Sequence, residues 1–351
     1  MKKKTRRVRI RARARWHEYG EKSSKYFLNL EKRNHVKKHM RKLNIDNVIT
    51  TDPMAILSEQ KRFYQDLCTS RSKGSNNTNI EAFLLNLNIP KLTDEQKDLC
   101  EGTILSGECK NVLDTFQNNK TPGSDGIPIE FYKMFWPLIE EPFINCVNEC
   151  YEKGELAGSQ KRAVITLIEK KGKDRLFLEN WWPISLLNVD VKIMSKVIAT
   201  KIKNILPAII RHNQTGFIND RYTGETIRSF FDLMEFTLEE NIPGLLIFID
   251  FHKAFNSLEW NFLSSCLKVF NFGADFICWV EIFYKNIQSC VMNNGFASDF
   301  FALERAVRQR DPLSPYLLVL AVEALAIAVR QNTSIRGISL LMGKKQNCSS
   351  T

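Results

Sequence analysis

The stretch that decides the fold is Leu245–Phe255, which reads LLIFIDFHKAF. Its first six residues, Leu245–Asp250, form an apolar run whose only charge is the final aspartate. A run this short, with aromatic and β-branched residues, predicts a strand that is covered on both faces. Asp250 would then stand at the carboxyl end of a buried strand, where α/β folds collect ligand and metal sites. The alternative is that Asp250 only terminates the strand.

The rest of the chain alternates helix and strand signals, which predict an α+β fold. Asn256 and Glu259 have the spacing of an N-cap and its capping-box partner, and their helix should end near Asn271–Gly273. The remaining signals predict strands at 163–169, 183–187, 289–292 and 296–303, a capping box at Thr93–Gln96, a flexible linker at 70–79, and helices at 54–68, 109–116, 130–152, 190–206 (stopped by Pro207), 225–240 and 274–286.

The net charge of +11 is concentrated at the N-terminus. Residues 1–42 carry 17 Lys and Arg against three Glu, so the other 309 residues sum to −3. Such an arm cannot form a core, and arginine-rich arms bind nucleic-acid phosphates or act as nuclear localisation signals. The alternative is a solubilising tail. The predicted nucleic-acid-binding residues are Arg6, Arg7, Arg9, Arg11, Arg13, Arg15, Lys22 and Lys25.

Cysteine usage and hydropathy predict an intracellular protein. Nine cysteines without a CxxC pair argue for a reducing compartment, the nucleus and cytoplasm, and against a disulfide-linked partner. Neither the pair Cys146/Cys150 nor the pair His35/His39 has partners nearby to complete a tetrahedral metal site, so we interpret both pairs as structural or solvated. The apolar stretch 313–329 is short for a membrane span and carries Glu323 near its centre, so we expect a buried helix and no membrane partner.

Seven stretches together resemble a known family. They are GEKSSKYFLNLEKRN (20–34), KTPGSDGIPIEFYKMFW (120–136), ITLIEKKGKD (165–174), NWWPISLLNVDVKI (180–193), QTGFINDR (214–221), FIDFHKAFNSLEW (248–260) and VRQRDPLSPYLLVLAVEALAIAVRQN (307–332). In this order they resemble the reverse transcriptase of LINE-type non-LTR retrotransposons. The resemblance implies the fingers and partial palm of a right-hand polymerase at 119–351, a helical N-terminal extension at 46–118 and a helical or disordered basic arm at 1–45.

The resemblance also implies a chemistry. Such polymerases join deoxynucleotides to a DNA primer or target on an RNA template, with two Mg²⁺ ions held by carboxylates. Asp250 matches the first of these carboxylates, both catalytic and metal-binding. Phe255 matches the residue that excludes a sugar 2′-hydroxyl, Gln309 one that lies against the incoming nucleotide, and Lys170 a lysine that meets the triphosphate.

Departures from the family pattern predict a loss of activity. The sequence contains no Asp-Asp pair, and we expect it to be truncated before the family's Tyr-x-Asp-Asp hairpin and thumb. Trp182 replaces an arginine that would grip the triphosphate, and Arg310 replaces a glycine that allows close approach of the backbone. Asp311 replaces a cysteine, at what we take to be a packing position.

Two functions follow from this pattern. The first is an RNA-directed DNA polymerase domain that is catalytically incomplete, and the second is a non-catalytic remnant that binds nucleic acid. An unrelated α+β or membrane protein would require seven coincidences. We expect the polypeptide of this sequence to behave as the non-catalytic remnant that binds nucleic acid. Substitution of Asp250 by alanine separates the two, because it should abolish polymerisation and leave RNA binding nearly unchanged.

Overall fold

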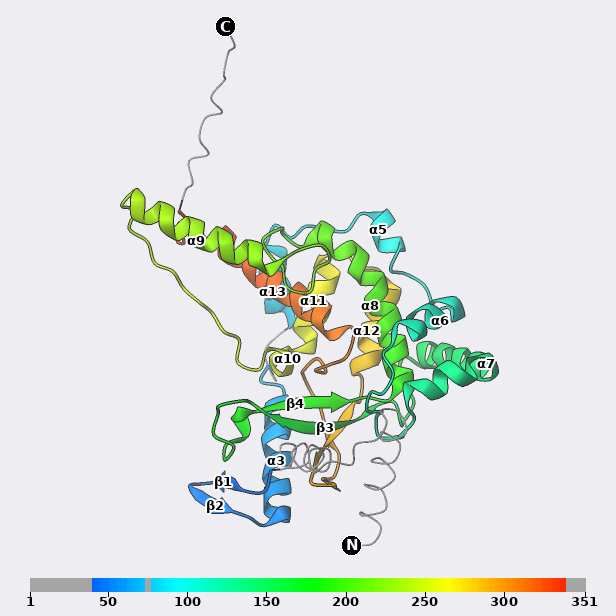
Figure 1. The fold of residues 1–351 in the computed structure, drawn as a ribbon. Helices are drawn as coiled ribbons and strands as arrows, with labels where there is room; N and C mark the ends of the chain where they lie inside the picture. Colours follow the sequence, from blue (N-terminus) through cyan, green and yellow to red (C-terminus); the bar gives the residue numbers. More distant parts are fainter. Residues whose placement is uncertain (1–39, 73–76, 339–351) are drawn as a thin grey trace, which may run out of the picture. The chain divides into compact units, whose positions relative to one another are not determined.

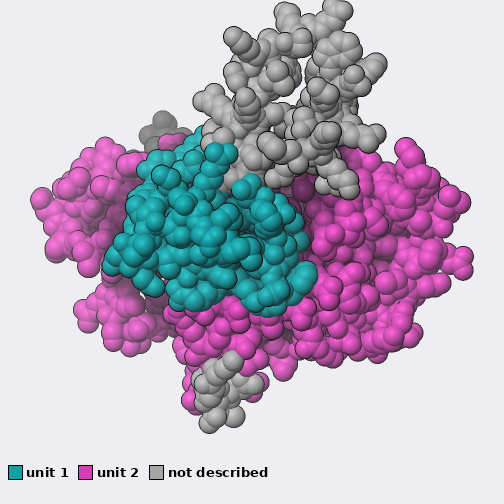
Figure 2. Space-filling model, turned by 90° about the horizontal axis from the view of Figure 1, so that it is seen from below, with its two compact units in different colours: residues 1–64, 164–184, 289–301 teal, residues 65–163, 185–288, 302–351 magenta. Residues whose placement is uncertain are grey.

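The computed structural model describes residues 40–72 and 77–338, and these combine helices with short strands, as an α+β fold requires (Figure 1). The basic arm lies outside the described residues. The chain divides into two compact units, which Figure 2 shows in different colours. The first unit comprises residues 1–64, 164–184 and 289–301, and the second comprises residues 65–163, 185–288 and 302–351.

The first unit opens with a hairpin. Strands β1 (Leu43–Ile45) and β2 (Val48–Thr50) pair antiparallel across Asp46 and Asn47, whose φ angles are 48° and 68°. Two consecutive left-handed residues make the kind of tight turn that matches the twist of paired strands, and Asp and Asn tolerate that conformation better than most residues. Helix α3 (Pro53–Cys68) follows, as its apolar spacing predicts, and extends into the second unit.

The main sheet lies mostly in the first unit and has the strand order β4-β3-β5-β6, with β7 also paired to β5. The predicted Asn-Asn-Gly hairpin is confirmed: β5 and β6 pair with Met292 opposite Ala297, and Asn294 and Gly295 adopt φ angles of 52° and 84°. The strands are β3 (Arg162–Glu169), β4 (Trp181–Leu186), β5 (Gln288–Asn293), β6 (Phe296–Ala297) and β7 (Phe301–Ala302), and the short helix η1 (Leu178–Asn180) precedes β4.

The second unit is helical. Its core is built on α8, an almost wholly buried helix whose residues include Ile193, Met194 and Ile198, and α8 packs against α6. Helix α11 packs against α4, α12 and α13. The helices are α4 (Asn77–Leu85), α5 (Asp94–Asp98), α6 (Ser106–Thr115), α7 (Ile129–Lys153), α8 (Val189–Ile209), α9 (Thr223–Glu239), α10 (Ala254–Ser257), α11 (Trp260–Val269), α12 (Ala274–Tyr284) and α13 (Ser314–Gln331).

Local sequence signals predict one helix end correctly and another wrongly. The capping box of Thr93 and Gln96 is present at α5. The prediction that Pro207 stops its helix is wrong, because α8 contains Pro207 and continues to Ile209. The guanidinium of Arg221 then donates to the carbonyls of Pro207 and Ile210, at 3.2 and 2.9 Å. This side chain satisfies carbonyls that a helix end leaves without partners.

The predicted strand at Leu245–Asp250 is wrong. This stretch is extended coil, and Leu245 and Phe248 are 85% and 79% exposed. Residues 243–250 make no backbone hydrogen bond to any part of the chain that the structure describes. A strand requires a neighbouring strand to take up its N–H and C=O groups, and the described sheet offers none here. The apolar run is therefore exposed instead of buried.

The predicted cap at Asn256 is also wrong. Lys253, with a φ of 50°, precedes the four-residue helix α10, which contains Asn256. The longer helix begins only at Trp260, and no side chain caps its N-terminus. It ends close to the predicted place, where Asn271 has a left-handed φ of 67°. A cap needs extended backbone at its own residue, and at Asn256 the chain is already helical.

Glu259 instead holds the start of the predicted linker. Its carboxylate accepts hydrogen bonds from the Ser70 and Ser72 hydroxyls at 2.8 and 3.2 Å and from the Arg71 amide at 3.1 Å. It also pairs with Arg305 at 3.3 Å. Residues 70–72 are thus fixed, and α4 already begins at Asn77, so the linker prediction for 70–79 is wrong at both ends.

The helix predicted near 313–329 is observed as α13, whose buried residues include Leu317, Leu320 and Ala324. By length and composition alone it could cross a membrane, and 44% of it is buried within the protein. Glu323 is buried, and its carboxylate pairs with Arg330 at 2.5 Å. A buried helix with a paired internal carboxylate fits the packing of a protein core.

Candidate functional site

The candidate catalytic residue Asp250 lies in the exposed coil that precedes α10, in the second unit. The described residues contain no group of three His, Cys, Asp or Glu side chains that could hold a metal ion. Mg²⁺ is bound through several oxygen ligands, and a pair of catalytic ions needs more than one carboxylate. The side chains around Asp250 therefore do not fit the two-ion site that the resemblance implies.

Two of the candidate nucleotide-binding residues lie in one neighbourhood. Phe255, in α10, is half-buried, and its carbonyl accepts a hydrogen bond from the Val307 amide at 2.7 Å. The Ala306 amide donates to the Leu258 carbonyl at 2.9 Å, so α10 and the segment 306–307 run side by side. Gln309 follows two residues after Val307 and is also half-buried. The structure thus brings the FHKAF and VRQRD stretches together through their backbones.

The other two candidates belong to the first unit. Lys170 follows β3, and its amide donates to the Asn180 carbonyl at 3.0 Å, which closes the β3–β4 loop. Trp182 lies on β4 and is 51% exposed, whereas its neighbour Trp181 is buried and donates to the Arg175 carbonyl at 3.0 Å. The alternation along the strand turns one indole into the core and the other outward.

Arg310 occupies a backbone conformation that favours glycine. Its φ is 76°, and the side chain is exposed. Left-handed backbone costs a residue with a Cβ about 1–2 kcal/mol, whereas glycine adopts it without that penalty. The glycine that the resemblance leads us to expect here therefore has a local reason in the backbone itself.

Replacing Arg310 by glycine should raise the free energy of unfolding by about 0.5–1 kcal/mol, which is the strain relieved less the greater entropy of glycine in the unfolded chain. Urea denaturation followed by circular dichroism measures this change. Arg310→Ala is the matched control, because it removes the same side chain and keeps the strain. An equal gain from both variants would assign the effect to the side chain and contradict the backbone explanation.

Asp311 does more than fill a packing position. It is buried, and its Oδ2 atom accepts hydrogen bonds from the amides of Leu313 and Ser314, both at 3.2 Å, and from the Ser314 hydroxyl at 3.1 Å. Burial raises the pKa of Asp311, while hydrogen bonds from Ser195 and Ser314 and the charge of Arg308 oppose that rise. The carboxylate therefore satisfies amides at the start of α13, in the manner of an N-terminal cap.

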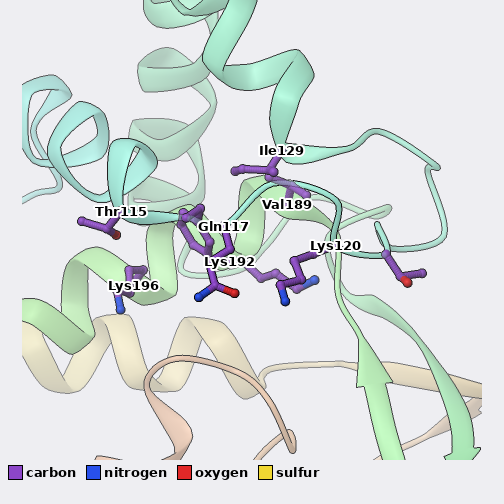
Figure 3. A pocket seen from close by; sticks show the side chains of 9 residues that line it. Thr115, Gln117, Lys120, Ile129, Val189, Lys192 and Lys196 are labelled. Atoms are coloured by element: carbon purple, nitrogen blue, oxygen red, sulfur yellow. The ribbon is translucent and has the colours of Figure 1, made fainter. Parts of the chain in front are cut away.

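Sequence reasoning missed a pocket of about 270 Å³ in the second unit (Figure 3). Lys192 and Lys196, four residues apart on α8, and Lys120, just before the glycine-rich turn, line it. The apolar stripe of α8 gives no sign of these lysines. Their i, i+4 spacing was the signal that could have found this site, because residues four apart lie on one face of a helix.

The glycine-rich turn that carries Lys120 is fixed against the start of α8. A Cβ on Gly123 would lie 2.2 Å from the Asn188 side-chain oxygen and 2.4 Å from its backbone nitrogen. That same oxygen accepts from the Ser124 hydroxyl and the Asp125 amide, at 3.3 and 3.4 Å. Only glycine allows the turn to approach so closely, which explains one position of the KTPGSDGI stretch in steric terms.

The predicted nucleic-acid-binding arginines and lysines, from Arg6 to Lys25, lie outside the described residues.

The sequence of this chain is similar to known proteins over much of its length. Residues 168–342 match the family described as reverse transcriptase (RNA-dependent DNA polymerase). The chain is similar to the Transposon TX1 uncharacterized 149 kDa protein of Xenopus laevis, with 31% identity over 312 residues that make up 89% of this chain and 24% of that protein.

Two Drosophila melanogaster proteins are also similar. One is the putative 115 kDa protein in type-1 retrotransposable element R1DM, 25% identical over 44% of this chain and 15% of its own length. The other is the Retrovirus-related Pol polyprotein from type-2 retrotransposable element R2DM, 25% identical over 59% of this chain and 19% of its own. The chain thus spans about a quarter or less of the length of these relatives. These findings confirm the predicted reverse transcriptase domain and its kinship with non-LTR retrotransposon proteins.

Proposed function

We propose that this chain, which carries the reverse transcriptase domain of a non-LTR retrotransposon, binds RNA as a 351-residue polypeptide and does not extend a primer on it. In this assignment the domain supplies fingers and part of a palm, and the arm at residues 1–45 supplies most of the contacts to phosphates. Its place in the cell would be the nucleus and cytoplasm.

The observation that carries the proposal is that Asp250 lies on exposed coil, without the further carboxylates that a two-ion site needs among the residues that the structure describes. Two-ion phosphoryl transfer places metal ions on both the attacking and the leaving oxygen, and each ion must be held by a fixed set of oxygen ligands. Asp250 lies on an exposed coil, and the sequence contains no Asp-Asp pair. Trp182 also lacks the guanidinium that could hold a triphosphate in two places. RNA binding requires none of these groups.

One preparation of the full chain tests both halves of the proposal. In a filter-binding assay it should retain a single-stranded RNA, and in a primer-extension assay with Mg²⁺ or Mn²⁺ it should add no more nucleotides than the Asp250→Ala variant. Extension clearly above that variant would show that Asp250 works with a metal ion, and the non-catalytic half of the proposal would be wrong. Failure to retain RNA would overturn the binding half.

A deletion of residues 2–15 locates the contacts. This segment carries nine Lys and Arg and no acidic residue. Each phosphate contact contributes about 0.7 to the slope of log K against log salt for single strands, so losing several contacts should flatten the slope clearly. A slope that the deletion leaves unchanged would assign the contacts to the body of the protein. Far-ultraviolet circular dichroism of both proteins controls for folding.

A further inference from the structure

We propose that the pocket lined by Lys120, Lys192 and Lys196 binds a backbone phosphate of the RNA strand, as a second contact separate from the basic arm; this rests on the proposed function. The pocket is built entirely from the second unit. Figure 3 shows the three lysines along one side of it, two from α8 and one from the segment that leads to the glycine-rich turn.

The charges in this pocket are not neutralised from within. None of the three lysines forms a salt bridge with a carboxylate among the residues that the structure describes. Lys192 and Lys196 are half-buried. Most surface lysines lie in water, and a partly buried ammonium group loses hydration that only an anion or other acceptor restores. Two such groups, with the exposed Lys120 beside them in the same pocket, therefore favour an anionic ligand.

The local electrostatics agree with this assignment. Burial lowers the pKa of Lys192, and Arg310 acts in the same direction, while Asp125 and Asp311 oppose the change. A phosphate would reverse the effect, because an opposite charge nearby favours the charged form. The two aspartates thus offset only part of the effect of burial on Lys192.

The walls of the pocket are held in place before any ligand arrives. The Lys133 ammonium donates to the Phe116 carbonyl at 2.5 Å and to the Asn118 side chain at 3.1 Å, which fixes the segment after α6. On the other side, Asn188 fixes the glycine-rich turn. Because these backbone segments are already fixed, binding need not order them, and that part of the conformational entropy cost is avoided.

The mixed lining favours a nucleic acid over a small anion. Beside the lysines, the pocket presents Phe116, Ile129 and Val189, together with the hydroxyls of Thr115 and Thr121. Apolar and hydroxyl groups next to cations suit a strand, whose phosphates alternate with sugars and bases. A free phosphate would use the lysines and leave the apolar wall without a partner. A nucleoside triphosphate shares the phosphate chemistry and is the alternative source.

Lysine footprinting on the full chain tests the inference directly. The protein is acetylated briefly with an N-hydroxysuccinimide ester, alone, with single-stranded RNA, or with a deoxynucleoside triphosphate at equal phosphate concentration, and modified lysines are read by mass spectrometry. RNA should lower the modification of Lys192 and Lys196 at least threefold. Lys203 lies on the same helix outside the pocket and is the matched internal control. RNA retention is measured on the same samples.

Each outcome has a distinct meaning. If RNA protects Lys192 and Lys196 and the triphosphate does not, the inference is supported. If the triphosphate protects these lysines as strongly as RNA does, the pocket is a free-nucleotide site and the inference is wrong. RNA retained without protection of these lysines would overturn the inference and leave the proposed function standing. No RNA retained would overturn both. The double variant Lys192→Gln/Lys196→Gln should lower the salt slope by about 0.7, the contribution of one phosphate, and Lys203→Gln should not change it.

Discussion

Replacing Asp311 by alanine should lower the free energy of unfolding by about 3 kcal/mol. The substitution leaves the buried Ser314 amide without its acceptor. It also takes one of two partners from the Leu313 amide, which keeps the Ser195 hydroxyl, and from the Ser314 hydroxyl, which keeps the Tyr284 hydroxyl. A buried donor that loses its partner costs about 1–3 kcal/mol, and the loss of an N-terminal helix cap costs about 1 kcal/mol. It would also leave the buried Arg308 without the charge of Asp311. Urea denaturation of both proteins measures the difference.

The dependence on pH gives this prediction a second test. Burial raises the pKa of Asp311, so the folded protein binds the Asp311 proton more tightly than the unfolded chain does. The contribution of Asp311 to the free energy of unfolding is therefore largest below the ordinary aspartate pKa. This contribution falls as the pH rises from that value through the raised one. Asp311→Ala lacks this contribution, so its cost should be larger at mildly acidic pH than at neutral pH. Asp311→Asn, which keeps an acceptor oxygen, should cost less than alanine. A cost equal to that of an exposed aspartate such as Asp299 would show that the carboxylate caps nothing.

Replacing Gly123 by alanine should lower the free energy of unfolding by about 1–3 kcal/mol, which is typical of overpacking in a fixed site. The new methyl group would lie 2.4 Å from the backbone nitrogen and 2.6 Å from the Cα of Asn188. Because these are backbone atoms at the start of α8, no rotation of a side chain can make room. The turn must instead move away, and Lys120 would move with it. Thermal unfolding and lysine footprinting follow the two consequences separately.

Two other glycines provide matched controls for Gly123. At Gly158 and Gly107 an added methyl group would meet no atom within 4 Å, and neither residue has a positive φ. Gly158→Ala should therefore be nearly neutral, and Gly107→Ala, inside α6, should stabilise by about 0.5–1 kcal/mol. Adding Asn188→Ala to Gly123→Ala should not restore stability, since the backbone clash persists. Full restoration would contradict the steric explanation.

Elements fixed by local chemistry could be predicted from the sequence. The Asn-Asn-Gly turn of β5 and β6 requires two residues that tolerate positive φ, and the capping box at Thr93 requires only residues three apart. The buried stripe of α8 follows from helical periodicity in the same way. Such features depend on a few neighbours in the chain, so a short window of sequence contains all the information they need.

Features that depend on distant partners could not be predicted. The run at Leu245–Asp250 has the composition of a strand, but whether it pairs depends on another strand elsewhere, about which the run itself contains no information. Glu259 has the spacing of a capping-box residue, and its partners lie at Ser70, Ser72 and Arg305. At Arg310, the resemblance indicated that a glycine was expected, and only the backbone angle of 76° explains why.

The set of contacts around Glu259 also bears on the order in which this chain can fold during synthesis. The Ser70 amide donates to Glu304 at 3.0 Å, across a separation of 234 residues. At ribosomal rates of about 5–20 residues per second, roughly 12–47 s pass between the translation of these two residues. Throughout that interval the end of α3 has been made and Glu304 has not. The contact between the end of α3 and Glu304 can therefore form only late in translation.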